Sequence, residues 1–284
     1  MSVIARPASL QDAFDALDAL PNADLLAGGT DFMVEVNFGH RRPPAVVAVR
    51  RVPELQGYQV RPDEVDIGAA VTWTTIEGEL ADELPALAAA ARTVGSPQMR
   101  NAATIGGNIA TASPAGDGLP VLLAADASLV LASRHGERTM PIADFITGVK
   151  RTILQPGEII TRVLVPRLTG PQEFLKVGTR NAMVISVVMA ALVVDLDGRT
   201  VRLGLGSVAP VPVRAREAEA YVEAQVDWDA ADGSARIGDA AVFERFGELA
   251  ATATAPIDDH RSTAAYRRHA VAVCARRALE RAMQ

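Results

Sequence analysis

The segment Gly95–Pro120 reads GSPQMRNAATIGGNIATASPAGDGLP, with five glycines and three prolines. Glycine weakens helices and strands and proline removes a main-chain donor, so this segment is not expected to form one regular element. Its apolar residues are nevertheless spaced as in a buried loop. Gly106 and Gly107, followed by Asn108, predict main-chain N–H groups that are free to bind a phosphate or a ring edge. A tight turn between a strand and a helix is the alternative.

A second glycine loop lies upstream, within Leu25–Phe32 (LLAGGTDF). A helix capped by Ser9 and a short strand precede it, and a helical turn follows, so the order is helix, strand, glycine loop, helix. In this order a glycine loop presents N–H groups to an anion at the start of a helix. A plain N-cap pair of Thr30 and Asp31 explains the same residues equally well. The glycine spacing differs from G-x-G-x-x-G, which disfavours a nicotinamide-binding Rossmann domain.

Composition indicates an ordinary globular chain of 284 residues, 49% hydrophobic and 22% charged, enough for one large domain or two to three small ones. The net charge of −6 argues against nucleic acid or an anionic membrane as the main partner. The single cysteine, Cys274, excludes an intrachain disulfide and a four-cysteine cluster held by this chain alone. The histidines have no metal-ligand spacing, so no metal site is expected. Without a secretory leader or an apolar span, a cytoplasmic location is expected.

The rest of the chain predicts short strands and several helices. Val184–Val194 is apolar enough to be a strand buried on both faces, and residues 195–198 predict a hairpin turn into a strand over 200–208. Beyond Pro212 the chain is alanine-rich and expected to be helical, ending in a basic helix over 262–283. The other expected strands cover residues 24–27, 45–49, 57–61, 65–69, 127–133, 137–141, 158–165 and 174–177. Another expected helix begins at Thr74-Thr75, and two more cover 84–93 and 119–125.

Three motifs together resemble a known family. AGGTD at Ala27–Asp31, RNAATIGGNIATASPAGD at Arg100–Asp117 and STAAYRRHAVAVCARRALERA near the C-terminus are similar to the FAD-binding medium subunit of the molybdenum hydroxylases. That family includes xanthine dehydrogenase, carbon monoxide dehydrogenase and bacterial dehydrogenases of nicotine and other N-heterocycles. The resemblance runs from the first helix to the last.

The resemblance implies an α+β fold. A vanillyl-alcohol-oxidase-like (PCMH-type) pair of FAD-binding subdomains would be followed by a C-terminal domain with a three-stranded sheet and a helical bundle. The implied boundaries are an N-terminal α/β subdomain at residues 1–55 and a second α+β subdomain at 56–170. A domain like the C-terminal part of the carbon monoxide dehydrogenase flavoprotein would then occupy 171–284.

The resemblance also implies which residues hold FAD, with both glycine loops meeting at its pyrophosphate. Asp117 would touch a sugar or ribityl hydroxyl, unless it only caps a helix, and Thr111 would approach the ribityl chain. Ile160 or Thr161 would line the isoalloxazine, unless strand burial explains both. Lys176 would stabilise negative charge on the reduced ring, against the alternative of a solvated lysine. The implied cofactor residues are Leu26, Ala27, Gly28, Gly29, Thr30, Asp31, Phe32, Thr104, Ile105, Gly106, Gly107, Asn108, Thr111, Asp117, Ile160 and Lys176.

The implied function is that of an electron-transfer flavoprotein subunit. In the family, a large molybdopterin subunit hydroxylates the substrate, a small subunit with two 2Fe-2S clusters passes electrons on, and FAD hands them to an external acceptor. These two subunits are the expected partners, in a dimer of heterotrimers. No catalytic acid or base is expected here, because the cofactor carries the chemistry. A self-sufficient flavin oxidoreductase of related fold and a non-catalytic nucleotide-binding protein are the alternatives.

Overall fold

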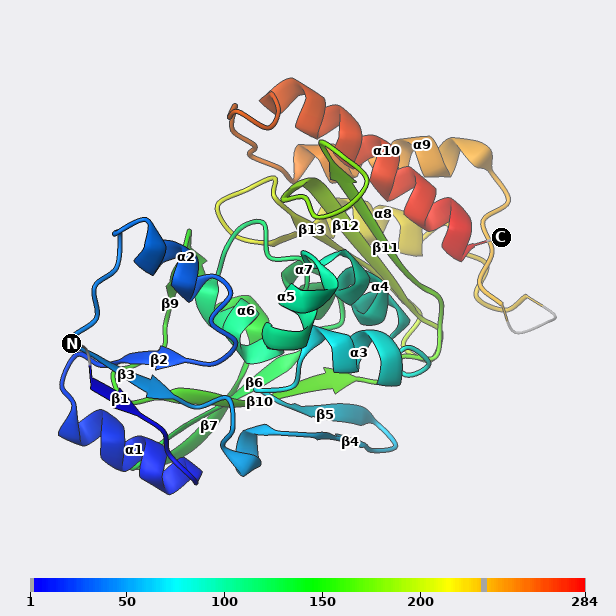
Figure 1. Cartoon of the computed structure of the whole chain (residues 1–284). Helices are drawn as coiled ribbons and strands as arrows, with labels where there is room; N and C mark the ends of the chain where they lie inside the picture. The colour runs from blue at the N-terminus through cyan, green and yellow to red at the C-terminus, as the bar shows by residue number, and fades with distance from the viewer. Residues whose placement is uncertain (1–2, 231–233, 284) are drawn as a thin grey trace.

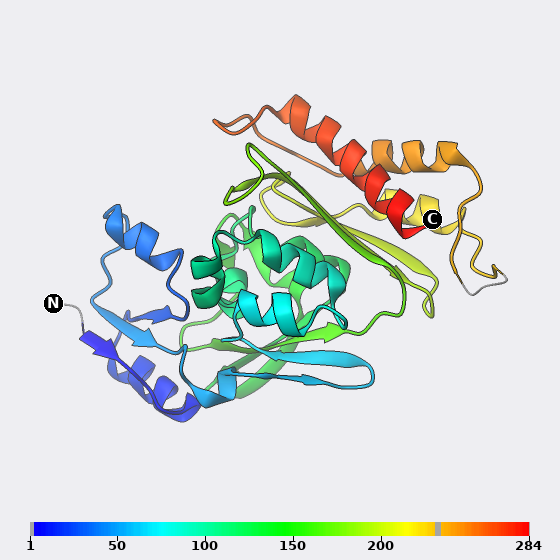
Figure 2. The ribbon, with the colours of Figure 1, turned by 45° about the vertical axis from the view of Figure 1, so that its right-hand side comes forward.

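The computed structural model describes residues 3–230 and 234–283 (Figures 1 and 2). Along the described chain, a three-stranded sheet is followed by a five-stranded sheet and then by a four-stranded sheet, and a two-stranded hairpin accompanies the second. Each of the expected segments 1–55, 56–170 and 171–284 therefore contains one of the larger sheets. The boundaries between these segments stay a prediction.

The N-terminal unit is a small parallel sheet with strand order β1-β3-β2. The predicted order of helix, strand, glycine loop and helix is confirmed, and the Ser9 side chain caps the first helix by accepting from the Asp12 N–H. Strand β1 was not predicted, because three residues are too short for a periodic pattern. The elements are β1 (Val3–Ala5), α1 (Leu10–Ala19), β2 (Asp24–Leu26), α2 (Phe32–Asn37) and β3 (Ala45–Ala48).

The middle unit is an antiparallel sheet with strand order β4-β5-β10-β6-β7, covered on one face by helices (Figure 1). The elements are η1 (Pro53–Leu55), β4 (Tyr58–Val60), β5 (Glu64–Gly68), α3 (Trp73–Glu79), α4 (Pro85–Thr93), α5 (Pro97–Ala102), α6 (Ile105–Thr111), α7 (Leu119–Ala124), β6 (Ser128–Ser133), β7 (Gly136–Pro141), η2 (Ile142–Asp144), β8 (Ile146–Gly148), β9 (Arg151–Thr152) and β10 (Ile159–Pro166).

The glycine-rich segment Gly95–Pro120 contains two short helices that the sequence analysis did not predict, α5 and α6, and the start of α7. Pro97 and Pro120 lie in the first turns of α5 and α7, where the missing N–H has no intrahelical partner to lose. Helix α6 stops at Ala112, which adopts the left-handed conformation with φ of 46°. The two prolines therefore begin helices rather than break them, and the left-handed Ala112 ends α6.

The C-terminal unit is a sheet with strand order β11-β12-β13-β14. It has four strands where three were expected, because Val213–Arg214 pairs with β13. Every residue of β12 except Asp195 is buried, as predicted, and Asp195 pairs with Thr200 across the predicted hairpin turn. The elements are β11 (Gln172–Gly178), β12 (Ser186–Asp195), β13 (Thr200–Gly206), β14 (Val213–Arg214), α8 (Arg216–Glu223), α9 (Ala240–Thr252) and α10 (Ala264–Ala282).

Helices cover both faces of this sheet (Figures 1 and 2). Helices α4 and α7 of the middle unit pack on one face, whereas α8 and α10 pack on the other, with α9 against both of them. Ala191 and Val193 of β12 belong to the apolar core that fills the middle unit. The two units therefore share one core. Among the described residues, no helix is long and apolar enough to cross a lipid bilayer.

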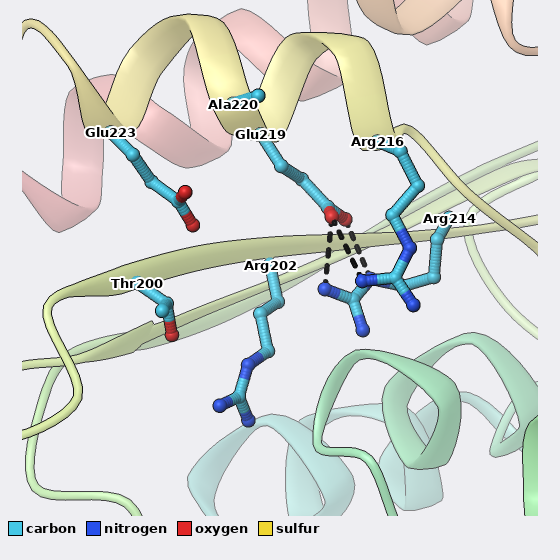
Figure 3. A pocket seen from close by; sticks show the side chains of 7 residues that line it. All are labelled: Thr200, Arg202, Arg214, Arg216, Glu219, Ala220 and Glu223. Carbon is cyan, nitrogen blue, oxygen red and sulfur yellow. Dashed lines mark hydrogen bonds and ion pairs between the residues drawn. The ribbon is translucent and has the colours of Figure 1, made fainter.

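A cavity of about 290 Å³ lies between β13 and α8 and is lined in part by Arg202, Arg214 and Arg216 (Figure 3). Arg214 donates two hydrogen bonds to the buried Glu219 carboxylate and a third, of 2.8 Å, to Asp126 of the middle unit. Arg216 also pairs with Glu219, and Arg202 pairs with Asp126 and Asp195, so all three arginines of the cavity have carboxylate partners. We interpret this cavity as part of an ionic joint between the two units rather than as a ligand site.

Candidate functional site

The two glycine loops lie in direct contact. Gly28 packs so closely on the end of α5 that a Cβ there would overlap the carbonyl oxygen of Ala102 and lie 2.8 Å from the Cα of Ala103. A Cβ on Gly107 would lie 4.0 Å from the Cβ of Ala27. Loops from the N-terminal and middle units therefore form one continuous surface.

The first loop offers unpaired main-chain donors. The N–H groups of Gly28, Gly29, Thr30 and Asp31 donate no hydrogen bond to any residue that the structure describes. Gly29 has φ of 75°, which glycine adopts without the steric cost of a side chain. Asp31 occupies the N-cap position of α2 without a side-chain capping bond, so a simple cap does not explain it. Successive unpaired N–H groups form a concave site that attracts anions.

The second loop differs from the prediction, because its glycine N–H groups are not free. Gly106 donates to the Ala69 carbonyl at 2.9 Å, and Gly107 donates to the Thr104 hydroxyl at 3.1 Å. The Asn108 N–H donates to the Thr104 carbonyl as part of α6. These three N–H groups are therefore already hydrogen-bonded within the protein. The glycines instead allow close packing, since a Cβ on Gly106 would lie 2.6 Å from the Ala69 Cβ.

A buried ion pair lies beyond the second loop. Asp117 is 8% exposed, and its Oδ2 accepts a hydrogen bond of 2.8 Å from Lys176, which also donates to the Thr93 carbonyl at 3.1 Å. Burial raises the pKa of Asp117 to about 6, although the charge and hydrogen bond of Lys176 oppose the shift. The alternative that Asp117 only caps a helix is wrong, because α7 has no side-chain cap. The alternative of a solvated lysine is also wrong, because the Lys176 side chain is only 8% exposed.

Two buried oxygen atoms beside this pair, Oδ1 of Asp117 and Oδ1 of Asn108, accept no hydrogen bond of good geometry from the residues that the structure describes. The Asn108 amide lies against the main chain on both sides of Asp117, within 3.2 Å of a Cβ built on Gly116 and 3.4 Å of one built on Gly118. Leaving a buried acceptor unpaired costs about 1–3 kcal/mol. Both oxygens are therefore suited to accept hydrogen bonds from the hydroxyl groups of a ligand.

Other predicted residues take mainly structural positions. Ile160 is buried in the core, and the Thr161 hydroxyl donates to the Val130 carbonyl at 3.2 Å, so strand burial accounts for both. Thr111 ends α6 and is partly exposed. Leu26 ends β2, Phe32 begins α2 with the Arg41 guanidinium 5.0 Å from its ring centroid, and Ile105 is fully buried at the start of α6.

Two residues near the loops escaped the sequence analysis. Thr93 accepts a hydrogen bond from Lys176 through its carbonyl, which any residue type supplies, and a hydrogen bond of its side chain lowers the pKa of Asp117. Lys150 lies in the hairpin between β8 and β9, and its ammonium group reaches Glu35 in the helix that follows the first loop. A strand of two residues has no detectable period, and a lysine there is indistinguishable from a solvated one.

Two family descriptions match nearly the whole chain. The FAD binding domain in molybdopterin dehydrogenase matches residues 1–168, and the CO dehydrogenase flavoprotein C-terminal domain matches residues 173–282. The chain is 35% identical over 206 residues to the nicotinate dehydrogenase FAD-subunit of Eubacterium barkeri, which covers 69% of this chain and 70% of that one. It is 30% identical over 280 residues to the glyceraldehyde dehydrogenase medium chain of Sulfolobus acidocaldarius, which covers 97% and 96%.

Solved structures have the same fold over nearly the full length. A chain of quinoline 2-oxidoreductase from Pseudomonas putida 86 superposes with a TM-score of 0.89 at 26% identity, covering 99% of this chain and 96% of that one. A chain of reconstituted CO dehydrogenase from Oligotropha carboxidovorans superposes with a TM-score of 0.88 at 28% identity, covering 99% and 97%. The expected α+β fold of the flavoprotein subunits is thereby confirmed.

Proposed function

This chain belongs to the family of FAD-binding subunits of the molybdopterin dehydrogenases, and we propose that it transfers electrons from an iron–sulfur partner subunit to an external acceptor. One observation supports the FAD binding that this role requires: the row of N–H groups in the first loop that bond to none of the described residues, packed against the second loop. Anionic diphosphates bind such rows because main-chain donors supply hydrogen bonds without ordering a side chain.

The residues of the site fit FAD in both charge and hydrogen bonding. We propose that the N–H groups of residues 28–31 donate to the diphosphate, since they have no other acceptor among the described residues. The unpartnered oxygens of Asn108 and Asp117 would accept from sugar or ribityl hydroxyls. The cation of Lys176 would stabilise negative charge that develops on the ring system.

Bound FAD would supply the redox chemistry, as an acceptor and donor of electrons that no side chain of this chain can replace. The chain itself would bind the diphosphate, orient the polyol and hold a buried positive charge at Lys176 near the site. Of the remaining predicted residues, the partly exposed ones would shape the walls around it, namely Leu26, Ala27, Phe32, Gly107 and Thr111. The buried ones would support these walls from the core, namely Thr104, Ile105, Gly106 and Ile160.

We infer that two partner subunits complete the enzyme. Relatives of this chain are named as FAD-subunits or medium chains of dehydrogenases, which are names for one component among several. We propose a small subunit with two 2Fe-2S clusters and a large subunit with molybdopterin, in a cytoplasmic dimer of heterotrimers. Purification of the chain with its co-expressed partners tests this, with molybdenum and iron content as the measurement.

The first prediction concerns FAD binding by the whole chain. Wild-type protein stripped of flavin should quench flavin fluorescence on titration with FAD. Gly28→Ala should lose most of this binding, because the added methyl group overlaps the Ala102 carbonyl and separates the loops. Overpacking of this kind typically costs about 1–3 kcal/mol.

The matched control is Gly78→Ala in α3, where an added Cβ meets nothing within 4 Å. Helix propensity makes this change neutral or slightly stabilising, so its FAD affinity should equal that of the wild type. A wild-type chain that stays colourless and binds no FAD would favour the non-catalytic alternative. Substrate oxidation by the chain without partners would favour a self-sufficient oxidoreductase.

A further inference from the structure

The hairpin of β8 and β9 touches α2, which follows the first glycine loop, and the end of α6, which lies within the second. Figure 1 shows β9 beside α2 and α6. The N–H of Lys150, at the tip of this hairpin, donates to the carbonyl of Ala112 at the end of α6, at 3.0 Å. Its ammonium group lies 2.6 Å from Glu35 and 3.8 Å from Asp31, at the start of α2. One residue thus contacts both halves of the candidate site.

The main chain on the α6 side of this contact is held in an unusual conformation. Lys150 has φ of 53° and Ala112 has φ of 46°, both in the left-handed region that residues other than glycine rarely adopt. Such conformations persist where the surrounding structure determines them. Here the hydrogen bond between the two residues links them directly, so the hairpin tip is fixed relative to α6.

The side chain is held on the α2 side by charge. The hydrogen bond to Lys150 lowers the pKa of Glu35, and the same bond raises the pKa of Lys150. Both groups therefore stay ionised around neutral pH. His40 also lies 3.5 Å from Glu35, on the far side of the carboxylate, and Arg41 is the other cation whose charge acts on Lys150.

We propose that Lys150 is a positioning residue that sets the spacing between the two glycine loops and thereby the affinity of the chain for FAD. The inference rests on the proposed function. The main chain of Lys150 is fixed to α6, and its ammonium group is fixed to α2, whose first turn follows the unpaired N–H groups. Removing the ammonium group leaves the first loop in contact with the second through the packing of Gly28 on Ala102 and of Ala27 beside Gly107.

A direct contact of the Lys150 ammonium with the diphosphate is the competing explanation, and the two differ in what Glu35 does. If Lys150 acts through α2, Glu35 is half of the link, and its neutralisation weakens FAD binding. If Lys150 binds the diphosphate itself, Glu35 competes for the cation, and its neutralisation leaves binding unchanged or strengthens it. Glu35→Gln therefore separates the two explanations.

The test measures the dissociation constant for FAD of the whole chain, stripped of flavin, by fluorescence titration. The main variant is Lys150→Asn, because asparagine tolerates the left-handed conformation and removes the cation. We expect Lys150→Asn and Glu35→Gln each to raise the dissociation constant about threefold to fivefold, the range for a partly exposed ion pair. The double variant should be no weaker than either single variant, because the two residues form one interaction.

Lys150→Arg should restore near wild-type affinity, which a purely structural loss at this position would not produce. Two outcomes overturn the inference: equal FAD affinity in all variants, or weaker binding by Lys150→Asn with unchanged or tighter binding by Glu35→Gln. Additive effects in the double variant also overturn it. A wild-type chain that binds no FAD contradicts the proposed function itself, which distinguishes that failure from a failure of the lysine link.

Discussion

At the scale of single residues, the Asp117–Lys176 pair is the most unusual feature of the site. Both side chains are less than a tenth exposed, so solvent screens the pair little. Burial of a charge is costly unless the charge is paired, and removing one partner of a buried pair typically costs about 3–5 kcal/mol. The folded protein retains this arrangement although one oxygen of Asp117 has no partner. A cost of this kind is typical of residues kept for binding rather than for stability.

The second prediction follows from the Asp117 pKa, which is about 6 in the folded chain against an ordinary value of 3.8. Between these pH values the folded chain holds a proton that the unfolded chain has released. The contribution of Asp117 to the free energy of unfolding is therefore largest below the ordinary value and falls as pH rises to about 6. In Asp117→Asn this fall should disappear.

Urea denaturation of both proteins at a series of pH values measures the effect. The stability of the wild type relative to Asp117→Asn should decrease as pH rises through this window. The other carboxylates titrate in both proteins and cancel in the difference. Two curves that stay parallel across the window would show that Asp117 has an ordinary pKa in the folded chain.

At the scale of elements, α6 links the two parts of the site. It begins at the cap Thr104, beside the loop contact, and carries Asn108 one turn later, beside Asp117. Its seven residues are too few to be stable alone, so its position depends on its caps and its packing. The Thr104 hydroxyl accepts from the Gly107 N–H, and Ala112 ends the helix in a left-handed conformation.

The third prediction concerns this cap. Thr104→Ala should lower the free energy of unfolding by about 1 kcal/mol, the usual value of an N-cap hydrogen bond. Hydrogen exchange of the α6 amides should accelerate, because the Gly107 N–H loses its acceptor. Thr104→Ser keeps the hydroxyl and should keep most of the stability. If the serine variant loses as much as the alanine variant, the buried methyl group of Thr104, and not its hydroxyl, holds the helix.

At the scale of the whole molecule, an apolar interface and an ionic joint connect the C-terminal sheet to the FAD-binding part. On β13, Gly204 lies so close to α7 that a Cβ there would overlap the Pro120 carbonyl oxygen. Asp126, just after α7, pairs with Arg214 and Arg202 of the sheet. Packing energies are larger than those of partly exposed ion pairs, so the apolar interface should dominate.

The fourth prediction compares the two kinds of contact. Gly204→Ala should destabilise the chain by about 1–3 kcal/mol or more, because the added methyl group meets main chain that cannot move aside. Asp126→Asn keeps a residue that tolerates the left-handed φ of 52° and removes only the charge, so it should cost less than about 1 kcal/mol. Urea denaturation measures both. A larger loss in Asp126→Asn than in Gly204→Ala would mean that the ionic joint dominates.

Features that depend on local pattern could be predicted from the amino-acid sequence alone. The order of α1, β2, glycine loop and α2, the buried strand β12 and its hairpin turn follow from caps, apolar runs and turn residues a few positions apart. The three motifs revealed the resemblance to the family, and that resemblance implied the FAD-binding fold. Local patterns can be recognised in a sequence because residues a few positions apart lie close together in any fold.

The fold of the whole chain sets which hydrogen-bonding groups in the site are free and which already have partners. It placed Gly28 against Ala102, gave the Gly107 N–H to Thr104, and paired Asp117 with Lys176. It also brought Lys150 to α2. The physical reason is that a hydrogen-bond donor is available only after every partner within reach has been counted, and most of these partners are far away in the sequence.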